Sequence, residues 1–264
     1  MTILVGLICK NGIAFASDSQ TSSEPGTSKR TDTDKISIVE FSDGKQALIA
    51  QAGDWDSSAF TVEFLEELAR NSALDDYRKP ADLLQDAVRH AKERLANLNN
   101  WEDRRDLEQE YLCNNPFTFL IAYYFQNQPY LYSLNSVPGF ARREFNYACA
   151  GCGSTVAEFI LSRSNSFLQM EVMKGFAAAV YTVEQVKTVD AACGGQTKAG
   201  VIFNKPEDKD TGERVRLSSK IPDLQRMVDV LTTSTSKLDN QLKKQWEDNL
   251  EAVWGDVESS GGLT

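Results

Sequence analysis

A threonine directly after the initiator methionine offers a nucleophile that needs no histidine. Removal of Met1 would give Thr2 a free α-amino group beside its own hydroxyl, and threonine is small enough for ordinary aminopeptidase trimming. An α-amine has a pKa of about 7.7–8.0, so near neutral pH it can accept the hydroxyl proton directly or through water. Threonine is also common at the start of a strand, and Thr2 alone favours that structural interpretation.

Two charged residues are predicted to approach Thr2. Residues 3–8 and 13–16 are apolar and flank a Lys-Asn-Gly turn, a pattern typical of a β-hairpin. Asp18 follows the second strand of this hairpin, so antiparallel pairing returns it to the end of the sheet where Thr2 begins the first strand. Lys35 opens the next predicted strand and could reach the same end. An ammonium there would lower the pKa of the Thr2 hydroxyl, while Asp18 would keep the lysine charged and oriented.

The histidine count restricts the other classes of hydrolase. His90 is the single histidine of 264 residues, and it lies in a predicted helix, residues 80–98, off the apolar face and beside charged residues. We expect a solvated helix residue rather than a catalytic base. A Ser-His-Asp or Cys-His hydrolase and a histidine-ligated metal site are therefore nearly excluded.

Cysteine usage is typical of a reducing compartment. The five cysteines are scattered through a chain whose first predicted strand begins too early to leave room for a signal peptide. Cys149 and Cys152 have the CxxC spacing of zinc sites and dithiols, but there is no second CxxC and no nearby histidine to complete four ligands. We expect small buried residues at the end of a strand, no metal, no cofactor and a cytoplasmic location.

Charge and hydropathy argue against nucleic acid and membranes as partners. The chain has 28 Lys and Arg against 38 Asp and Glu, a formal net charge of −10. An acidic protein repels phosphate backbones and anionic lipid surfaces. No apolar stretch approaches the length of a membrane span. The 41% hydrophobic composition is typical of a globular protein with a substantial core.

The remaining pattern alternates strand pairs with helix pairs, after a polar loop at residues 21–34. Strand pairs that lead into helix pairs, twice over, favour two stacked sheets covered by helices on both outer faces. Strands are predicted at residues 35–39, 46–50, 117–125, 129–134, 147–150, 197–203 and 214–217, and helices at residues 59–69, 80–98, from 154 onward and at 170–189.

A long helical pattern follows at residues 221–254, with apolar residues at steps of three or four. Packing on the core and contact between subunits are equally open for it. We predict one sandwich domain over residues 1–218 and a C-terminal helical extension over residues 219–264. The extension would pack on the same domain or on a neighbouring subunit.

Six short stretches form one pattern, defined by their order and their spacing along the chain. They are Thr2-Ile-Leu-Val-Gly, Asn11-Gly-Ile-Ala-Phe-Ala-Ser-Asp18-Ser, Asp34-Lys35-Ile, Ala52-Gly53-Asp54, Tyr147-Ala-Cys-Ala-Gly151-Cys-Gly-Ser154 and Asp190-Ala-Ala-Cys193-Gly-Gly. Over residues 2–205 this series resembles the β-type proteasome subunits and their bacterial Anbu-type relatives, within the N-terminal nucleophile hydrolases. The resemblance implies an α+β fold, a four-layer αββα sandwich, to which this chain adds an extra C-terminal helix.

The resemblance also implies a catalytic set for a threonine-type endopeptidase. Thr2 would attack the peptide bond and form an acyl-enzyme, with Asp18 and Lys35 as its activating pair. The amide of Gly53 would donate to the oxyanion. Asp190 matches the acidic residue that helps to orient the N-terminal amine.

Four further residues fall at binding or supporting positions of the same family. Ser22 would lie in the loop that binds the substrate backbone by strand addition. Cys152, Ser154 and Cys193 would support the N-terminal amine. The family usually has serine where Cys152 and Cys193 stand, and a thiol is a poorer hydrogen-bond partner than a hydroxyl.

Assembly and substrate follow from the resemblance as expectations. A homo-oligomeric ring or spiral would enclose the active sites and act on peptides or unfolded proteins, with no unfoldase partner identified. The predicted helices at residues 59–69, 80–98 and 221–254 carry apolar stripes suited to head-to-tail contacts. Two other functions stay open: an N-terminal nucleophile amidase acting on a small amide, and a noncatalytic proteasome-like structural subunit that retains Met1.

Overall fold

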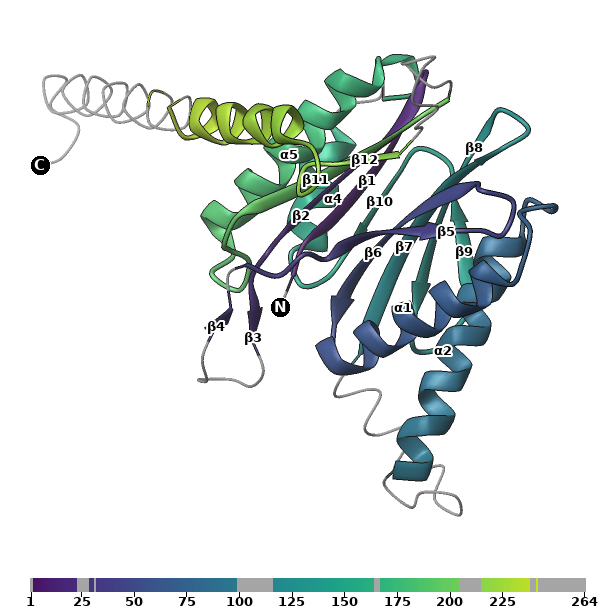
Figure 1. The fold of residues 1–264 in the computed structure, drawn as a ribbon. Coiled ribbons are helices and arrows are strands. Elements are labelled where there is room, and N and C mark those ends of the chain that lie inside the picture. Colours follow the sequence, from purple (N-terminus) through teal and green to yellow (C-terminus); the bar gives the residue numbers. More distant parts are fainter. Residues whose placement is uncertain are drawn as a thin grey trace, which may run out of the picture.

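Two five-stranded antiparallel sheets form the centre of the computed structural model, which describes residues 2–22, 29–30, 32–98, 116–163, 167–204, 215–237 and 241 (Figure 1). The first sheet has the order β10-β1-β2-β11-β12, and the second has the order β5-β6-β7-β8-β9. The first comprises β1 (Leu4–Cys9), β2 (Gly12–Asp18), β10 (Tyr147–Ala150), β11 (Thr197–Phe203) and β12 (Val215–Leu217). The second comprises β5 (Ile36–Glu40), β6 (Gln46–Gly53), β7 (Phe117–Phe125), β8 (Gln128–Asn135) and β9 (Ala141–Glu144).

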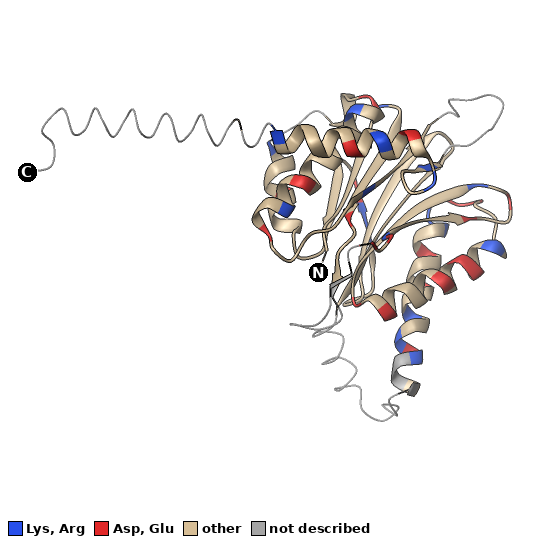
Figure 2. Cartoon of the chain, turned by 60° about the vertical axis from the view of Figure 1, so that its left-hand side comes forward, with Lys and Arg blue, Asp and Glu red and all other residues tan. Residues whose placement is uncertain are grey.

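Helices cover the outer face of each sheet. Helices α1 (Trp55–Arg70) and α2 (Lys79–Leu98) pack on the second sheet, whereas α4 (Ser154–Ser162) and α5 (Val172–Val189) pack on the first. The short 3-10 helix η1 (Phe167–Gln169) precedes α5. Charged residues are frequent on these outer helices, whereas most residues of the strands between them are uncharged (Figure 2). The four-layer αββα sandwich predicted from the sequence is therefore confirmed.

Strand β1 shows how the layers are held together. Its side chains alternate between two cores, because successive residues of a strand point to opposite faces. Val5 and Leu7 face α5, whereas Leu4 and Ile8 join the core between the two sheets. All six residues of β1 are buried, and burying an aliphatic side chain contributes about 1.5–3 kcal/mol. The strand that follows Thr2 is thus fixed on both faces.

Helix α1 begins four residues earlier than the predicted start at residue 59. Asp54 caps it, since its carboxylate accepts a hydrogen bond of 3.0 Å from the Ser57 amide. The buried face of the first turns is formed by Ser57, Ser58 and Thr61, which are small and polar. The prediction relied on apolar periodicity and missed this polar start.

Other differences concern strand ends and one edge strand. The prediction ended one strand at residue 50, but β6 continues to Gly53 because it pairs with β7 from Ala47 to Gly53. Strand β9 was not predicted, since Arg142 and Arg143 are exposed on it, and charged residues are typical of sheet edges. The predicted loop at residues 21–34 contains a two-stranded sheet of β3 (Thr21–Ser22) and β4 (Lys29–Arg30).

The described part of the C-terminal pattern packs on the first sheet's core. Residues 222–237 are helical, and Leu224 and Val228 are buried in the core that also contains α5. The predicted helix at 221–254 otherwise lies outside the described residues, apart from residue 241. The division into domains 1–218 and 219–264 stays a prediction. None of the described helices is both long and apolar enough to span a membrane.

Candidate active site

Lys35 lies at the centre of the site and donates all three of its ammonium protons. Its Nζ lies 2.7 Å from Thr2 Oγ1, 2.8 Å from Asp18 Oδ1 and 2.5 Å from the main-chain oxygen of Gln20. The lysine side chain is only 1% exposed. An ammonium has three donors and no acceptor, so its hydrogen-bonding capacity is fully used. Burial lowers the pKa of Lys35, while the Asp18 carboxylate opposes that shift.

The Asp18 carboxylate is also buried and fixed by several hydrogen bonds. It lies at the end of β2, paired with Thr197 of β11, and its side chain is fully buried. Oδ1 accepts from the Ile3 amide at 3.0 Å as well as from Lys35, and Oδ2 accepts from the Gly194 amide at 3.0 Å. The hairpin register predicted from the sequence brings Asp18 back to Thr2, and Lys35 reaches both from the residue before β5.

A tight turn before α4 holds the main chain of Thr2. Gly151 has a φ of +92°, and a Cβ at this position would lie 2.1 Å from the Thr2 carbonyl oxygen. Only glycine allows this approach. The same carbonyl accepts from the Gly153 amide at 3.4 Å and from Cys152 Sγ at 3.4 Å. The turn thus sets where the Thr2 nitrogen and hydroxyl point.

A chain of two thiols and a carboxylate begins at the Thr2 nitrogen. Cys152 Sγ accepts from this nitrogen at 3.3 Å and lies 3.7 Å from Cys193 Sγ, which in turn donates to Asp190 Oδ2 at 3.6 Å. The hydrogen bond with Cys193 lowers the pKa of the Cys152 thiol to about 7, although burial acts in the opposite direction. Burial of Cys152 was predicted, but this prediction is wrong: Cys152 is exposed at the turn, while Cys193 is 4% exposed.

The remaining predicted residues lie around this centre with fewer contacts. Gly53 ends β6 with a φ of +102°, two residues after Gln51, whose amide donates to the Lys35 carbonyl oxygen at 3.0 Å. Ser22 belongs to β3 and pairs with Lys29. Ser154 begins α4, and its amide donates to the Gly151 oxygen at 3.1 Å. Among the described residues, no side-chain hydrogen bond joins Ser154 to Thr2.

Three residues of the site were not found from the sequence. Gln20 supplies the third acceptor of Lys35, and its side-chain Nε2 donates to the Ala192 oxygen at 3.1 Å. Gly194 donates to Asp18, and Gly151 contacts Thr2. Gln20 and Gly194 act here through their main chains, which side-chain identity does not reveal. The positive φ of Gly151 has a sequence signal in the Gly-Cys-Gly run that precedes a helix.

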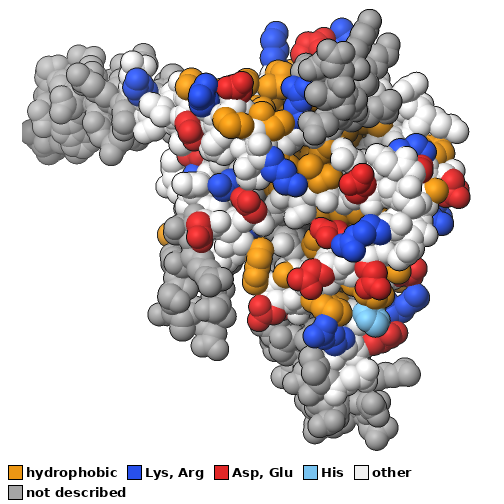
Figure 3. Space-filling model, in the orientation of Figure 1, with side chains coloured by type: hydrophobic (Ala, Val, Ile, Leu, Met, Phe, Trp, Pro, Cys, Tyr) orange, Lys and Arg blue, Asp and Glu red, His pale blue; other side chains and the backbone are white. Residues whose placement is uncertain are grey.

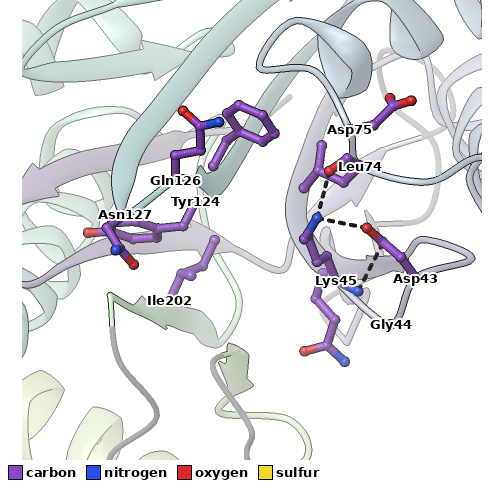
Figure 4. A pocket seen from close by; sticks show the side chains of 11 residues that line it. Asp43, Gly44, Lys45, Leu74, Asp75, Tyr124, Gln126, Asn127 and Ile202 are labelled. Carbon is purple, nitrogen blue, oxygen red and sulfur yellow. Dashed lines mark hydrogen bonds and ion pairs between the residues drawn. The ribbon is translucent and has the colours of Figure 1, made fainter.

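A pocket elsewhere on the molecule takes no part in this arrangement. It lies between the β5–β6 and β7–β8 turns, where Lys45 Nζ donates to Asp43 and to the Leu74 oxygen and faces Tyr124 and Asn127 across the opening (Figure 4). Lys45 precedes β6, whereas Gly53 ends it, so the pocket is at the opposite end of the second sheet. Acidic and basic side chains are interspersed over the face in Figure 3, without a patch of one sign.

His90 is exposed on α2, as predicted, and it is not part of the site. Its ring stacks on Phe64, with 4.1 Å between the ring centroids. Both residues belong to the helices outside the second sheet. The site therefore contains no histidine among the residues that the structure describes.

Several solved structures of similar fold are Anbu proteins. The chain superposes on "Helical Assembly of the Anbu Complex from Pseudomonas aeruginosa" with a TM-score of 0.65 at 15% identity, covering 92% of this chain and 96% of the other. For Anbu (ancestral beta-subunit) from Yersinia bercovieri the TM-score is 0.63 at 14% identity, covering 96% of both chains. An Anbu (Gly-1) mutant from Hyphomicrobium sp. strain MC1 gives 0.65 at 14% identity, covering 92% and 97%. At such low identity these likenesses establish the fold.

The family follows from the sequence itself. A search of curated proteins finds no match. The model of the family described as "Proteasome subunit" matches residues 2–202, which is most of the chain and includes Thr2, Asp18, Lys35 and the two cysteines of the site. Both the fold and this match agree with the resemblance seen in the sequence. The chain belongs to the proteasome subunit family.

Proposed function

We propose that this protein is a threonine-type peptidase in which Thr2, freed by removal of Met1, is the nucleophile. The observation that carries the proposal is the 2.7 Å contact between Lys35 Nζ and Thr2 Oγ1, within a buried group completed by Asp18. A positive charge beside the hydroxyl stabilises the alkoxide and lowers its pKa. A strand does not need a hydrogen bond from a buried lysine to a threonine hydroxyl in order to be stable.

The path of the Thr2 hydroxyl proton depends on which atoms already form hydrogen bonds. Thr2 Oγ1 accepts from Lys35, so its own proton is available to a base. In the sequence Met1 precedes Thr2, so the Thr2 nitrogen is a peptide nitrogen and has no basic lone pair. After hydrolysis of the Met1–Thr2 bond it becomes an α-amine, which takes the hydroxyl proton directly or through one water. Cys152 Sγ, 3.3 Å away, contacts this nitrogen.

Acyl transfer then proceeds in two balanced steps. Thr2 Oγ1 bonds to the substrate carbonyl carbon, whose oxygen takes up the electron pair, and the Gly53 amide donates to that oxyanion. The C–N bond breaks as the α-ammonium returns its proton to the leaving nitrogen, which leaves an ester on Thr2. A water molecule, deprotonated by the α-amine, hydrolyses the ester and restores the hydroxyl. Strand β3, which contains Ser22, would bind the substrate backbone by strand addition.

Intact mass and peptide hydrolysis test this function together. The purified chain is expected to lack the mass of Met1 and to hydrolyse fluorogenic peptides, because only the free amine can serve as the base. The matched control carries extra residues ahead of Met1, keeps the nitrogen acylated and should show no hydrolysis. A native chain that retains Met1 and is inactive would support the noncatalytic subunit. Hydrolysis of small amides without peptides would support the amidase.

We also propose assembly into a ring or spiral of identical subunits. The similar structure from Pseudomonas aeruginosa is described as a helical assembly. In this chain Met227 and Val230, 41% and 64% exposed, lie on the helix at residues 222–237. The two residues are three positions apart, so they share one exposed face of this helix that is available for contact with a neighbouring subunit.

Light scattering tests the assembly. Met227→Glu with Val230→Lys is expected to reduce the particle mass by a factor of at least about two without lowering the melting temperature by more than a few degrees, because both residues are exposed. Met227→Leu with Val230→Ile keeps the apolar surface and should leave the mass unchanged. A wild-type monomer at working concentration would contradict the proposed assembly.

A further inference from the structure

The geometry points to a zinc site formed by Cys152, Cys193 and Asp190, with the Thr2 α-amine as fourth ligand after removal of Met1. The two Sγ atoms and a carboxylate oxygen of Asp190 all lie within 4.8 Å of one another. The three residues come from the turn before α4, the end of α5 and the turn after it. The fourth ligand and the effect on activity rest on the proposed function, whereas the three-residue site does not.

The separations between these atoms match tetrahedral coordination. With Zn–S bonds of about 2.3 Å and Zn–N or Zn–O bonds of about 2.0–2.1 Å, two sulfurs on one zinc lie about 3.8 Å apart, and a sulfur and a nitrogen or oxygen about 3.5 Å apart. The observed distances are 3.7 Å between the two Sγ atoms, 3.6 Å from Cys193 Sγ to Asp190 Oδ2, and 3.3 Å from Cys152 Sγ to the Thr2 nitrogen. Each of these three distances lies within about 0.2 Å of the tetrahedral value.

The donor set selects zinc over the alkaline-earth ions. Two thiolates, one carboxylate and one amine are ligands that Zn²⁺ takes in tetrahedral sites, whereas Mg²⁺ and Ca²⁺ require mainly oxygen. The family resemblance implies serine at both cysteine positions. Two hydroxyls would form a hydrogen-bonded group, so the thiols are what make metal binding available in this chain.

The residues around the three side chains orient the ligands and leave them accessible to a zinc ion. The Ala192 amide donates to Asp190 Oδ1 at 2.9 Å, which leaves Oδ2 directed at Cys193. A ligand oriented by a main-chain donor loses less entropy on binding a metal. Cys152 is exposed, so an ion can enter from solvent. Lys35 interacts electrostatically with both thiols, but Asp18 pairs with it and reduces its repulsion of the ion.

Zinc at this place would switch off the peptidase reversibly. Binding displaces one proton from each thiol, and it uses the lone pair of the α-amine that would otherwise accept the Thr2 hydroxyl proton. The nucleophile then has no base, although Lys35 still donates to it. A chelator removes the ion and returns the amine. The ligand chemistry therefore couples activity to the concentration of free zinc.

Zinc and cobalt titrations of the untagged, chelator-treated full chain test the site. We expect one Zn²⁺ per chain, and with Co²⁺ a thiolate-to-metal charge-transfer absorption. Cys152→Ser with Cys193→Ser, which supplies the family's usual residues, should weaken zinc binding by at least about 100-fold. The matched control is Cys149→Ser, since Cys149 belongs to the CxxC spacing but packs in the core beside α5, and it should bind zinc as the wild type does.

The possible results distinguish the zinc site from the proposed peptidase function. Thiol-dependent zinc binding by an inactive chain would support the metal site and contradict the peptidase. An active chain that binds no zinc under reducing conditions, or binds it equally well after both serine substitutions, would overturn the metal site alone. For an active chain, we compare the rate of peptide hydrolysis with zinc to the rate with chelator. The ratio of the two rates should be about 0.1 or lower in the wild type and close to one in the double variant. An unchanged ratio in the wild type would overturn amine ligation.

Discussion

Replacing Thr2 with alanine is expected to reduce peptide hydrolysis by at least about 10⁴-fold, because the variant keeps the α-amine but has no oxygen to attack with. The fold should persist, since β1 beyond residue 2 is fixed by two cores. The loss of one acceptor of Lys35 should cost about 1–3 kcal/mol of stability. Initial rates on a fluorogenic peptide, with circular dichroism and urea denaturation on the same sample, measure both effects.

The matched control for this variant is Thr2→Ser. Serine is also trimmed of Met1 and retains the hydroxyl beside the amine, so its rate should exceed that of Thr2→Ala by at least about 100-fold. Intact mass must show that both variants have lost Met1. Equal rates for alanine and serine would rule out Thr2 as the nucleophile, because a contaminating peptidase or another residue would then account for the hydrolysis.

The fold could be predicted where apolar periodicity and turn residues coincide. Strands at 117–125, 147–150 and 197–203 were placed correctly, because each is a short apolar run between turn signals. The errors occurred where another interaction decides the boundary. Ser57 and Ser58 are buried in α1 although they are polar, and the charged β9 pairs with β8 through its main chain.

The site could be predicted as far as the hairpin register determines it. Antiparallel pairing of β1 and β2 brings Asp18 back to Thr2, and this follows from the Lys-Asn-Gly turn. Cys152 and Cys193 are 41 residues apart, and no local pattern indicates that their thiols meet. Gln20 acts through its main-chain oxygen, which every residue type has. These contacts depend on long-range packing of β10, α4 and α5.

Replacing Lys35 with methionine should reduce kcat by about 10³-fold while KM changes little. Methionine fills a similar volume but supplies no charge to stabilise the Thr2 alkoxide, and removal of a single preorganised donor commonly costs about 10²–10³ in kcat. The same change leaves the fully buried Asp18 carboxylate without its cation, so we expect a loss of about 3–5 kcal/mol of stability. Steady-state kinetics and urea denaturation of the variant measure the two effects.

A second substitution separates the catalytic effect from the structural one. Asp18→Asn in the Lys35→Met background removes the unpaired charge, while the side-chain oxygen of the introduced amide can still accept from the Ile3 amide as Asp18 Oδ1 does. The double variant should regain part of the lost stability, because removal of the buried unpaired charge outweighs the loss of the acceptor that Asp18 Oδ2 gives to the Gly194 amide. Its kcat should stay low, because the alkoxide still lacks an ammonium. If kcat instead recovered together with stability, Lys35 would be a structural partner of Asp18, and the proposed activation of Thr2 would be wrong.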